Sequence, residues 1–307
     1  MTHKLAIVGV GKIARDQHIP AIAANPNFEL TATASRNAEV GGVPAWRDLA
    51  SLLDAKPEIN CVSLCTPPQV RYSDARLALE AGRHVMLEKP PGATLSEVHD
   101  LVRIAKEREL TLFATWHSRH AAAVAHARNW LRGKKILRLA ISWKEDVRQW
   151  HPGQEWIWEA GGLGIFDPGI NALSVMTEIL PQSVHLKQAE LFFPSNRQTP
   201  IAAQLEFHDP CEAEISAELD WREQGPPAWN IEVETTVGTA KLSEGGAKME
   251  IDGTETAVGH DAEYPGLYAR FADLLDSGES DVDLKPMLHV SDAFTLGKRV
   301  TVEPFDW

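Results

Sequence analysis

Short apolar runs alternate with amphipathic stretches along the first 120 residues of the chain. Strands are predicted at residues 4–10, 29–34, 61–66, 84–89 and 111–116. Between them, apolar residues recur at helical spacing over 11–24, 46–55, 70–82 and 95–110. Strands that alternate with helices of this length are typical of βαβ units. The pattern therefore predicts an α/β domain, with a doubly wound parallel sheet, over residues 1–120.

The pattern of apolar and polar positions changes after residue 136, where strand-like stretches follow one another with short connections. Alternating apolar and polar positions predict strands at 135–143, 184–194, 201–208, 211–221, 228–238 and 239–245. Helices are expected at 168–180, 264–278 and 286–300. This pattern predicts an α+β second domain over residues 121–307, built on a large, mostly antiparallel open sheet.

The composition is that of a globular protein and excludes several classes of function. Of 307 residues, 44% are hydrophobic and 24% are charged, and no apolar run approaches the length of a membrane span. A formal charge of −13 argues against nucleic-acid binding. Three cysteines and a start without a signal peptide indicate reduced thiols in a cytoplasmic protein. Cys61 and Cys65 lack a second pair at zinc spacing, so no metal site is expected.

The first predicted strand runs into a G-x-G-x-x-A loop that opens a helix. Gly9 would permit the tight turn, Gly11 the close approach of a pyrophosphate, and Ala14 the packing of helix on strand. The helix N-terminus would hold the phosphates. An ordinary strand-to-helix turn is the alternative, but the βαβ context favours a dinucleotide site that also includes Lys12 and Ile13.

The end of the second predicted strand bears on which dinucleotide would bind. NAD sites commonly carry an acidic residue there to hold both ribose hydroxyls. This chain has Ser35 and Arg36, with no acid before Glu39. A hydroxyl and a guanidinium suit a 2′-phosphate, which favours NADP. Arg36 could instead be solvated or stack on adenine, so use of NAD stays open.

Three further segments carry a family resemblance. They are T-P-P at 66–68, E-K-P at 88–90 and G-G-L-G-I-F-D-P-G-I-N at 161–171. With the opening glycines, they resemble the glucose–fructose oxidoreductase/inositol dehydrogenase family over residues 1–120 and 143–180. The resemblance implies a Rossmann domain with a nicotinamide cofactor, followed by a sheet domain that carries a sugar site. It also implies cofactor contacts from Thr66, Pro67, Glu88 and Lys89.

Within the family, the similarity is greatest to bacterial aldose 1-dehydrogenases, through Ser35-Arg36, the stretch T-W-H-S-R-H-A-A-A-V and Asn171. It implies oxidation of a sugar such as D-galactose or L-arabinose at C1 to the lactone. The family's exposed sheet face would suit a homodimer. Two other interpretations stay open: a non-catalytic sugar or dinucleotide sensor of the same fold, and a dehydrogenase or reductase that acts on another polyol or carbonyl compound.

Oxidation at C1 needs a hydride acceptor, a base for the attached hydroxyl and a positive group near its oxygen. Lys89 follows a parallel strand, at the edge where ligands bind in such sheets. It could orient the hydroxyl, act as the base, or be an ordinary surface lysine. Glu88 could hold the local geometry or contact the nicotinamide ribose.

Asp167 and Asn171 are four residues apart at an expected helix start, so they share one face. Many family members have His where Asn171 stands, and Asn cannot accept a proton at neutral pH. Asp167 is therefore the expected base, with Asn171 orienting the substrate. The alternative for Asp167 is an N-cap ahead of Pro168.

A sugar offers an apolar face to aromatic rings and hydroxyls to polar side chains. Most of the ten tryptophans lie between residues 116 and 229. Trp150 and Trp229 are candidates for stacking, with His117 and Glu145 as hydrogen-bonding groups. The expected substrate-binding residues are therefore His117, Glu145, Trp150, Asp167, Asn171 and Trp229.

Overall fold

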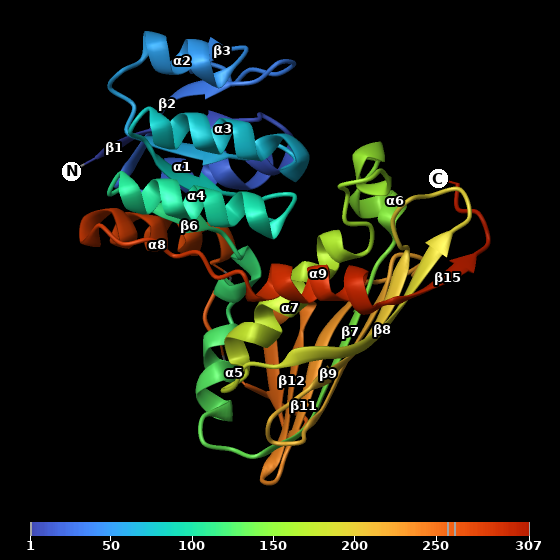
Figure 1. Ribbon diagram of the computed structural model, residues 1–307. Coiled ribbons are helices and arrows are strands. Elements are labelled where there is room, and N and C mark those ends of the chain that lie inside the picture. Colours follow the sequence, from blue (N-terminus) through green and yellow to red (C-terminus); the bar gives the residue numbers. More distant parts are fainter. Residues whose placement is uncertain (1, 257, 261, 307) are drawn as a thin grey trace. The chain divides into compact units, whose positions relative to one another are not determined.

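The computed structural model of the protein describes residues 2–256, 258–260 and 262–306 (Figure 1). The chain forms two compact units. The first contains the described residues up to His117 together with Tyr264–Asp283; the second contains the described residues of Ser118–Glu263 and those from Leu284 onward. The sequence predicts a single boundary at residue 120, whereas the structure returns Tyr264–Asp283 to the first unit.

The first unit is built on a six-stranded parallel sheet. Its strands are β1 (His3–Val8), β2 (Phe28–Ala34), β3 (Ala45–Trp46), β4 (Cys61–Leu64), β5 (His84–Leu87) and β6 (Leu112–Ala114). They lie in the order β3-β2-β1-β4-β5-β6 and all pair in parallel. This confirms the doubly wound sheet. The order reverses between β1 and β4, where the loops that follow these two strands diverge to opposite sides.

Helices cover both faces of this sheet. They are α1 (Ile19–Ala24), α2 (Leu49–Ala55), α3 (Pro68–Glu80), α4 (Leu95–Glu107) and α8 (Glu263–Ser277). Two of these helices begin with a capping side chain: Asp48 accepts the N–H of Ser51 at the start of α2, and Thr94 forms a capping box with Glu97 at the start of α4. The helix predicted over 11–24 is present, but its turn at Ala14–His18 widens to a π-helix.

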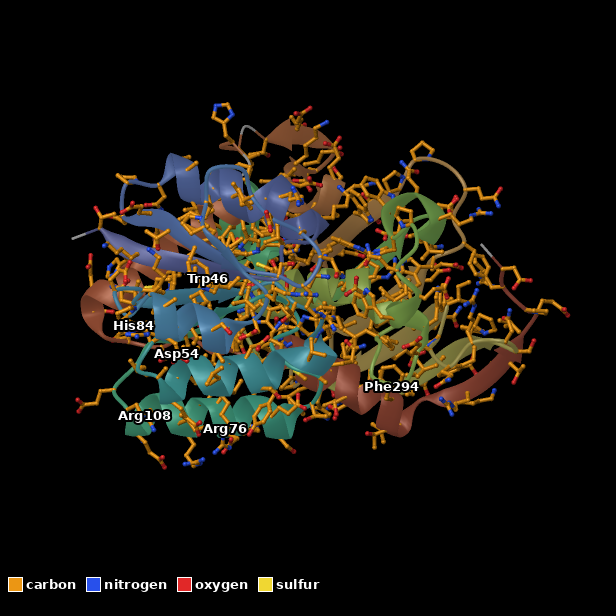
Figure 2. The ribbon with its side chains drawn as sticks, turned by 90° about the horizontal axis from the view of Figure 1, so that it is seen from above. Trp46, Asp54, Arg76, His84, Arg108 and Phe294 are labelled. Atoms are coloured by element: carbon orange, nitrogen blue, oxygen red, sulfur yellow. The ribbon has the colours of Figure 1, made fainter. Side chains whose placement is uncertain are left out.

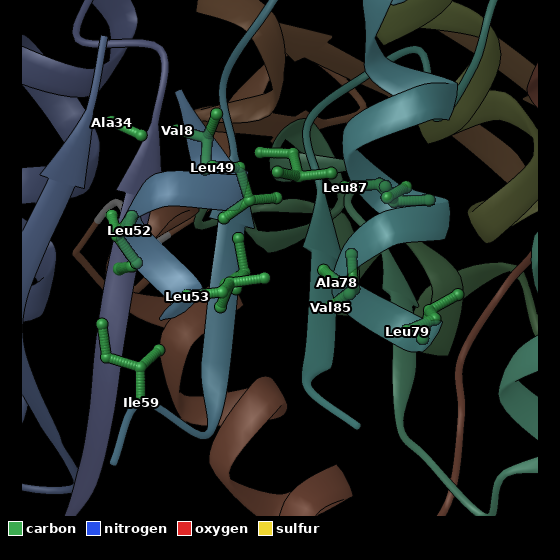
Figure 3. Packing of buried hydrophobic residues seen from close by; sticks show 14 of the residues in the cluster. Val8, Ala34, Leu49, Leu52, Leu53, Ile59, Ala78, Leu79, Val85 and Leu87 are labelled. Carbon is green, nitrogen blue, oxygen red and sulfur yellow. The ribbon is translucent and has the colours of Figure 1, made fainter. Parts of the chain in front are cut away.

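Two apolar clusters hold the sheet between these helices. On one face, Leu49 and Leu52 of α2 and Leu79 of α3 pack on Val8 and Leu87 (Figure 3). Burial of such side chains stabilises a fold by about 1.5–3 kcal/mol each. The outer sides of these helices are charged: Arg76 on α3 binds Glu80 and Asp100 and projects outward (Figure 2).

The other face of the sheet is covered by α8. This helix belongs to the first unit, so a single domain boundary at residue 120 does not describe that unit fully. Leu267, Phe271 and Leu274 form an apolar stripe at helical spacing, and each is fully buried against β-strand residues such as Leu5 and Ile7. The sequence predicts this helix, but its amphipathic pattern does not say which sheet its apolar side covers.

The second unit is built on a nine-stranded sheet. Its strands are β7 (Ile136–Lys144), β8 (His185–Pro194), β9 (Ala202–His208), β10 (Glu214–Asp220), β11 (Ala228–Thr235), β12 (Gly238–Ser243), β13 (Lys248–Ile251), β14 (Thr254–Thr256) and β15 (Lys298–Val302). The order is β14-β13-β12-β11-β7-β10-β9-β8-β15. Only the β7–β10 and β8–β15 pairs within this described sheet are parallel, which confirms a mostly antiparallel sheet.

One face of this sheet is covered by helices and the other is open. The covering helices are α5 (Val124–Leu131), α7 (Phe166–Ile179) and α9 (Lys285–Leu296), while the short α6 (Val147–Trp150) follows β7 (Figure 1). The open face carries a shallow cavity of about 890 Å³ lined by polar side chains, among them Arg138, Gln204, Glu206, Glu218 and Glu232. None of the predicted site residues lines it.

Several predicted elements differ at their ends because tertiary pairing decides them. The helix predicted over 46–55 begins at Leu49, since Ala45 and Trp46 pair with β2. The helix predicted over 286–300 ends at Leu296, and Lys298–Val302 joins β8 as an edge strand. The pattern also missed α5, α6, β13 and β14. Within the described ranges, no helix combines the length and apolar character that a membrane span needs.

Candidate active site

The glycine loop after β1 has the features of a phosphate cradle. Gly9 has φ +88°, and a Cβ there would lie 2.9 Å from both the backbone N and Cγ2 of Thr66, so the loop after β4 requires a glycine at this position. A Cβ at Gly11 would meet nothing within 4 Å. Protein packing therefore does not explain Gly11, whereas room for a pyrophosphate does. Ala14 is completely buried beneath the loop.

The start of the helix after this loop suits an anion. No side chain caps it at Ile13, which is 37% exposed, and the first N–H groups of a helix favour negative charge. Lys12 is exposed and pairs with Asp16. Nearby in the loop after β4, the hydroxyl of Thr66 is buried and has no hydrogen-bond partner among the described residues. Pro67 then leads into α3. These features fit a bound dinucleotide.

The end of β2 presents the two residues that the sequence singled out. The N–H of Ser35 donates to the carbonyl of Trp46, which fixes the chain as it leaves the strand. Arg36 is exposed. Arg15 donates to the backbone carbonyl of Glu39, not to its carboxylate, at 3.2 Å. Ser35 and Arg36, directly after β2, thus offer a hydroxyl and a guanidinium, as the sequence predicts.

Glu88 and Lys89 lie at the carboxyl end of β5. Glu88 is 3% exposed, and its carboxylate is held within the protein. It accepts hydrogen bonds from the Tyr264 hydroxyl at 2.9 Å and the Lys89 N–H at 2.6 Å, and its Oε1 lies 3.1 Å from Nε2 of His18. Lys89 is half-buried. The sequence suggested that Glu88 holds the local geometry or contacts the nicotinamide ribose. These contacts match the first of these roles.

Burial alone would raise the pKa of Glu88. Its hydrogen bond to His18 and its electrostatic interactions with His18, His117 and Lys89 outweigh burial and hold the pKa well below the usual value. His117 stacks on Tyr264, with ring centroids 5.3 Å apart and an interplanar angle of 19°. His117 therefore belongs to the first unit, next to the helix that holds Glu88.

In the second unit, Glu145 directly follows β7 and is buried. Its Oε2 accepts the indole N–H of Trp229 at 2.8 Å, and its Oε1 accepts that of Trp221 at 3.3 Å. Trp229 in turn lies 5.0 Å from Trp150, centroid to centroid, at an angle of 59°. Trp150 is 40% exposed, which leaves an indole surface open to a ligand. The structure thus brings together three of the predicted substrate-binding residues.

Asp167 and Asn171 lie on α7. The helix begins at Phe166 with Ile165 in the cap position, so Asp167 stands inside the first turn and the alternative interpretation as an N-cap is wrong. Asp167 is buried and Asn171, one turn later on the same side, is half-buried. A Cβ at Gly169 would lie 2.6 Å from Cδ1 of Leu219, so the motif's glycine lets α7 approach β10 closely.

His151 is a site residue that sequence reasoning missed. Its Nε2 lies 3.5 Å from Oε1 of Glu145 and its Nδ1 lies 3.6 Å from Oδ2 of Asp167. The ring also packs on Trp221 at 5.2 Å. The imidazole therefore stands between two buried carboxylates. The only available signal was its place in V-R-Q-W-H-P, next to Trp150, and that segment carries no motif.

His18, Tyr264, Tyr268 and Arg71 were also missed. They lie in amphipathic helices where nothing in the spacing separates a buried polar residue from a solvated one. Among the described residues, no group of three or more His, Cys, Asp or Glu side chains is placed to hold a metal ion.

The chain is similar to known oxidoreductases along nearly its whole length. Residues 3–115 match an oxidoreductase family with an NAD-binding Rossmann fold. Galactose 1-dehydrogenase from Pseudomonas fluorescens is 43% identical over 302 residues, covering 98% of each chain. The crystal structure of D-galactose-1-dehydrogenase from Rhizobium etli is 55% identical, with a TM-score of 0.95 over 99% of this chain and 98% of that one.

A more distant similarity concerns the fold alone. KijD10, a 3-ketoreductase from Actinomadura kijaniata crystallised with NADP and TDP-benzene, is 19% identical and covers 98% of this chain and 100% of its own. Its TM-score is 0.85. The same two-unit architecture therefore occurs in a protein that binds NADP.

Proposed function

Because the chain belongs to the glucose–fructose oxidoreductase/inositol dehydrogenase family of NAD(P)-dependent oxidoreductases, we propose that it oxidises C1 of D-galactose to the corresponding lactone. The observation that carries the proposal is similarity along nearly the whole chain to two galactose 1-dehydrogenases. L-Arabinose has the same ring configuration at C2 to C4, so it is a second substrate of the same pocket.

The second unit supplies the groups that such a sugar needs. The exposed indole of Trp150, held against Trp229, offers a flat apolar surface to the C–H face of the ring. Glu145 is fixed by two indole N–H groups, and its carboxylate is a rigid acceptor for a sugar hydroxyl. Asn171 offers an amide that both donates and accepts hydrogen bonds.

Asp167 is the proposed base. Oxidation removes a hydride from C1 and a proton from O1, and oxidised nicotinamide is the hydride acceptor when it is bound. Asp167 takes the proton, since Asn171 cannot. His151, whose Nδ1 lies 3.6 Å from the Asp167 carboxylate, is placed to orient that carboxylate and to receive the proton from it.

Lys89 has a different part in this scheme. Its ammonium group favours the negative charge that develops on O1 as the proton leaves. The hydrogen bond from the Lys89 N–H to the buried carboxylate of Glu88 fixes the backbone from which Lys89 extends. Lys89 belongs to the first unit and Asp167 to the second, so their action on one substrate is part of the proposal.

NADP is the preferred cofactor in this proposal, with NAD also used. Ser35 and Arg36 suit the 2′-phosphate, while the glycine loop and Thr66 suit the pyrophosphate. These contacts belong to the first unit, and each is open to test by substitution.

Initial rates of nicotinamide reduction test the function. D-Galactose and L-arabinose are compared with their C4 epimers D-glucose and D-xylose, and with myo-inositol, using NADP and NAD in parallel. We expect turnover of the first two sugars, faster with NADP at limiting concentration. No turnover of any sugar by protein that still binds NADP would overturn the proposal and favour a sensor of the same fold; turnover of myo-inositol alone would favour a polyol dehydrogenase.

A further inference from the structure

A chain of hydrogen bonds runs through the buried centre of the first unit. The Ser63 hydroxyl donates to Sδ of Met86 at 3.4 Å, and the Tyr268 hydroxyl donates to Oγ of Ser63 at 3.3 Å. The Tyr268 oxygen also lies 2.8 Å from Nδ1 of His18, and which of the two donates depends on the protonation of the ring.

The other ring nitrogen of His18 faces the carboxylate of Glu88. Its Nε2 lies 3.1 Å from Oε1 of Glu88, a carboxylate oxygen that has no proton to give. If Nδ1 donates to Tyr268 as Nε2 donates to Glu88, His18 is an imidazolium paired with a carboxylate. His18 is 0% exposed and Glu88 is 3% exposed, so the pair is removed from water. Burial opposes the charge, yet contacts with Cys65, Tyr268 and Glu88 raise the pKa of His18.

The second carboxylate oxygen of Glu88 is directed at the next residue. Oε2 accepts the N–H of Lys89 at 2.6 Å. Arg71, which is 2% exposed, donates to the carbonyl oxygens of Glu88 and Pro90 on either side of Lys89. The backbone of Lys89 is thus held by a carboxylate at its N–H and by a guanidinium on its neighbours' carbonyls. Such a clamp fixes the direction in which the lysine side chain leaves the chain.

We propose that His18 is a positioning residue that, by pairing with Glu88, fixes the orientation of Lys89. The inference rests on the proposed function in one respect, the role of Lys89 in turnover. A neutral residue in place of His18 would leave Glu88 as an uncompensated buried charge, which favours protonation or movement of the carboxylate. Either change would release the N–H of Lys89 from its acceptor.

The first test is His18→Gln in the full-length enzyme. We expect kcat to fall by about 10²-fold, since misplacement of a catalytic group by about 1 Å costs that much. The Kd for NADP and the KM for galactose are expected to change little, because Tyr268, Ser63 and Glu88, which form hydrogen bonds with the His18 ring, lie neither in the glycine loop nor among the predicted substrate-binding residues. A purely structural role would instead lower stability with an unchanged kcat for the folded fraction.

His84→Gln is the matched control. His84 lies at the opposite end of β5, where its Nδ1 accepts the N–H of Thr111 at 3.0 Å. Glutamine keeps an acceptor there, so kcat should stay at the wild-type value. An equal fall of kcat in both variants would mean that any disturbance of β5 lowers turnover, and would overturn the specific role of His18.

A double-mutant cycle with Lys89→Ala separates this inference from the proposed function. If His18 acts through Lys89, His18→Gln should have no further effect on the residual rate of the Lys89→Ala variant. Additive losses would show that His18 acts by another route and would overturn the inference. A wild-type rate for Lys89→Ala would instead remove Lys89 from the proposed mechanism.

The charge of His18 can be measured without turnover. Nitrogen chemical shifts of the histidine rings, with NADP bound, should show both nitrogens of His18 protonated at neutral pH. In the Glu88→Gln variant, one nitrogen should lose its proton. A neutral His18 ring in the wild-type protein would overturn the inference even if the enzyme oxidises galactose as proposed.

Discussion

The Nδ1 atom of His151 lies 3.6 Å from Oδ2 of Asp167, and it has no hydrogen-bond partner among the described residues. The distance is slightly longer than a hydrogen bond, and catalytic hydrogen bonds are often long before substrate binds. The opposite nitrogen lies 3.5 Å from Glu145. A single imidazole thus stands beside both the proposed base and the carboxylate held by Trp221 and Trp229.

This arrangement makes Asp167 the first residue to replace. Asp167→Asn keeps the shape of the side chain and removes its ability to accept a proton, so kcat with galactose should fall by about 10²–10⁴-fold. The Kd for NADP, measured by fluorescence titration, should stay near the wild-type value because the glycine loop is unchanged. A kcat within a few-fold of wild type would remove Asp167 as the base.

Asp209→Asn is the matched control for that experiment. Asp209 is also a buried aspartate of the second unit, and its Oδ2 accepts the N–H groups of Cys211 and Ala213 in a turn. We expect lower stability but an unchanged kcat. An equal loss of turnover would mean that replacing any buried aspartate of this unit disturbs the enzyme.

Gly9 and Gly11 should respond in opposite ways to replacement by alanine. At Gly9, the positive φ and a Cβ contact of 2.9 Å predict a loss of about 1–3 kcal/mol in the free energy of unfolding. At Gly11, where a Cβ meets nothing within 4 Å, stability should be unchanged while the Kd for NADP rises. Thermal unfolding and NADP titration of both variants check this. Unchanged NADP binding in Gly11→Ala would argue against a pyrophosphate at this loop.

Arg36 should decide between the two nicotinamide cofactors. Arg36→Ala removes a guanidinium proposed to pair with the 2′-phosphate, and a hydrogen bond to a charged group is worth about 1.5–3 kcal/mol. We therefore expect the KM for NADP to rise by about tenfold or more, with little change for NAD. The control is Arg76→Ala on the outer side of α3, which should leave both KM values unchanged. A parallel rise for NADP and NAD would indicate that Arg36 contacts a part common to both cofactors, such as adenine.

The sequence predicted the parts of this protein that depend on local pattern. Alternating strands and helices led to the six-stranded parallel sheet, and the order G-x-G-x-x-A placed Gly9 and Gly11 at its switch point. Period-two patterns led to the mostly antiparallel second sheet. Trp150, Trp229 and Glu145 were singled out by residue type, and they lie together because β7, α6 and β11 converge there.

The features that could not be predicted depend on contacts between distant parts of the chain. Tyr264 reaches Glu88 across 176 residues and Tyr268 reaches His18 across 250, because α8 returns to the first sheet. Nothing in the local sequence of α8 specifies that return. His151 was missed for the same reason. Its candidate role depends on its position next to Asp167 and Glu145, which lie on other parts of the chain.

The buried His18–Glu88 pair predicts a specific dependence of stability on pH. The pKa of His18 is raised above 6.5 on folding, so its contribution is complete below pH 6.5 and is lost as pH rises through the higher value. The pKa of Glu88 is lowered from 4.5, so its contribution is lost only as pH falls below that value. The groups facing the pair are Cys65, Tyr264, Tyr268, His117 and Lys89.

The measurement is the difference in free energy of unfolding between wild type and Glu88→Gln, taken from urea titrations between about pH 5 and about pH 9. We expect the difference to be greatest below pH 6.5 and to shrink above it. His84 provides the opposite sign, because burial and the charge of His3 lower its pKa; the stability of wild type relative to His84→Gln should therefore increase with pH up to 6.5. A difference for Glu88→Gln that stays constant across the range would mean that His18 folds as a neutral ring.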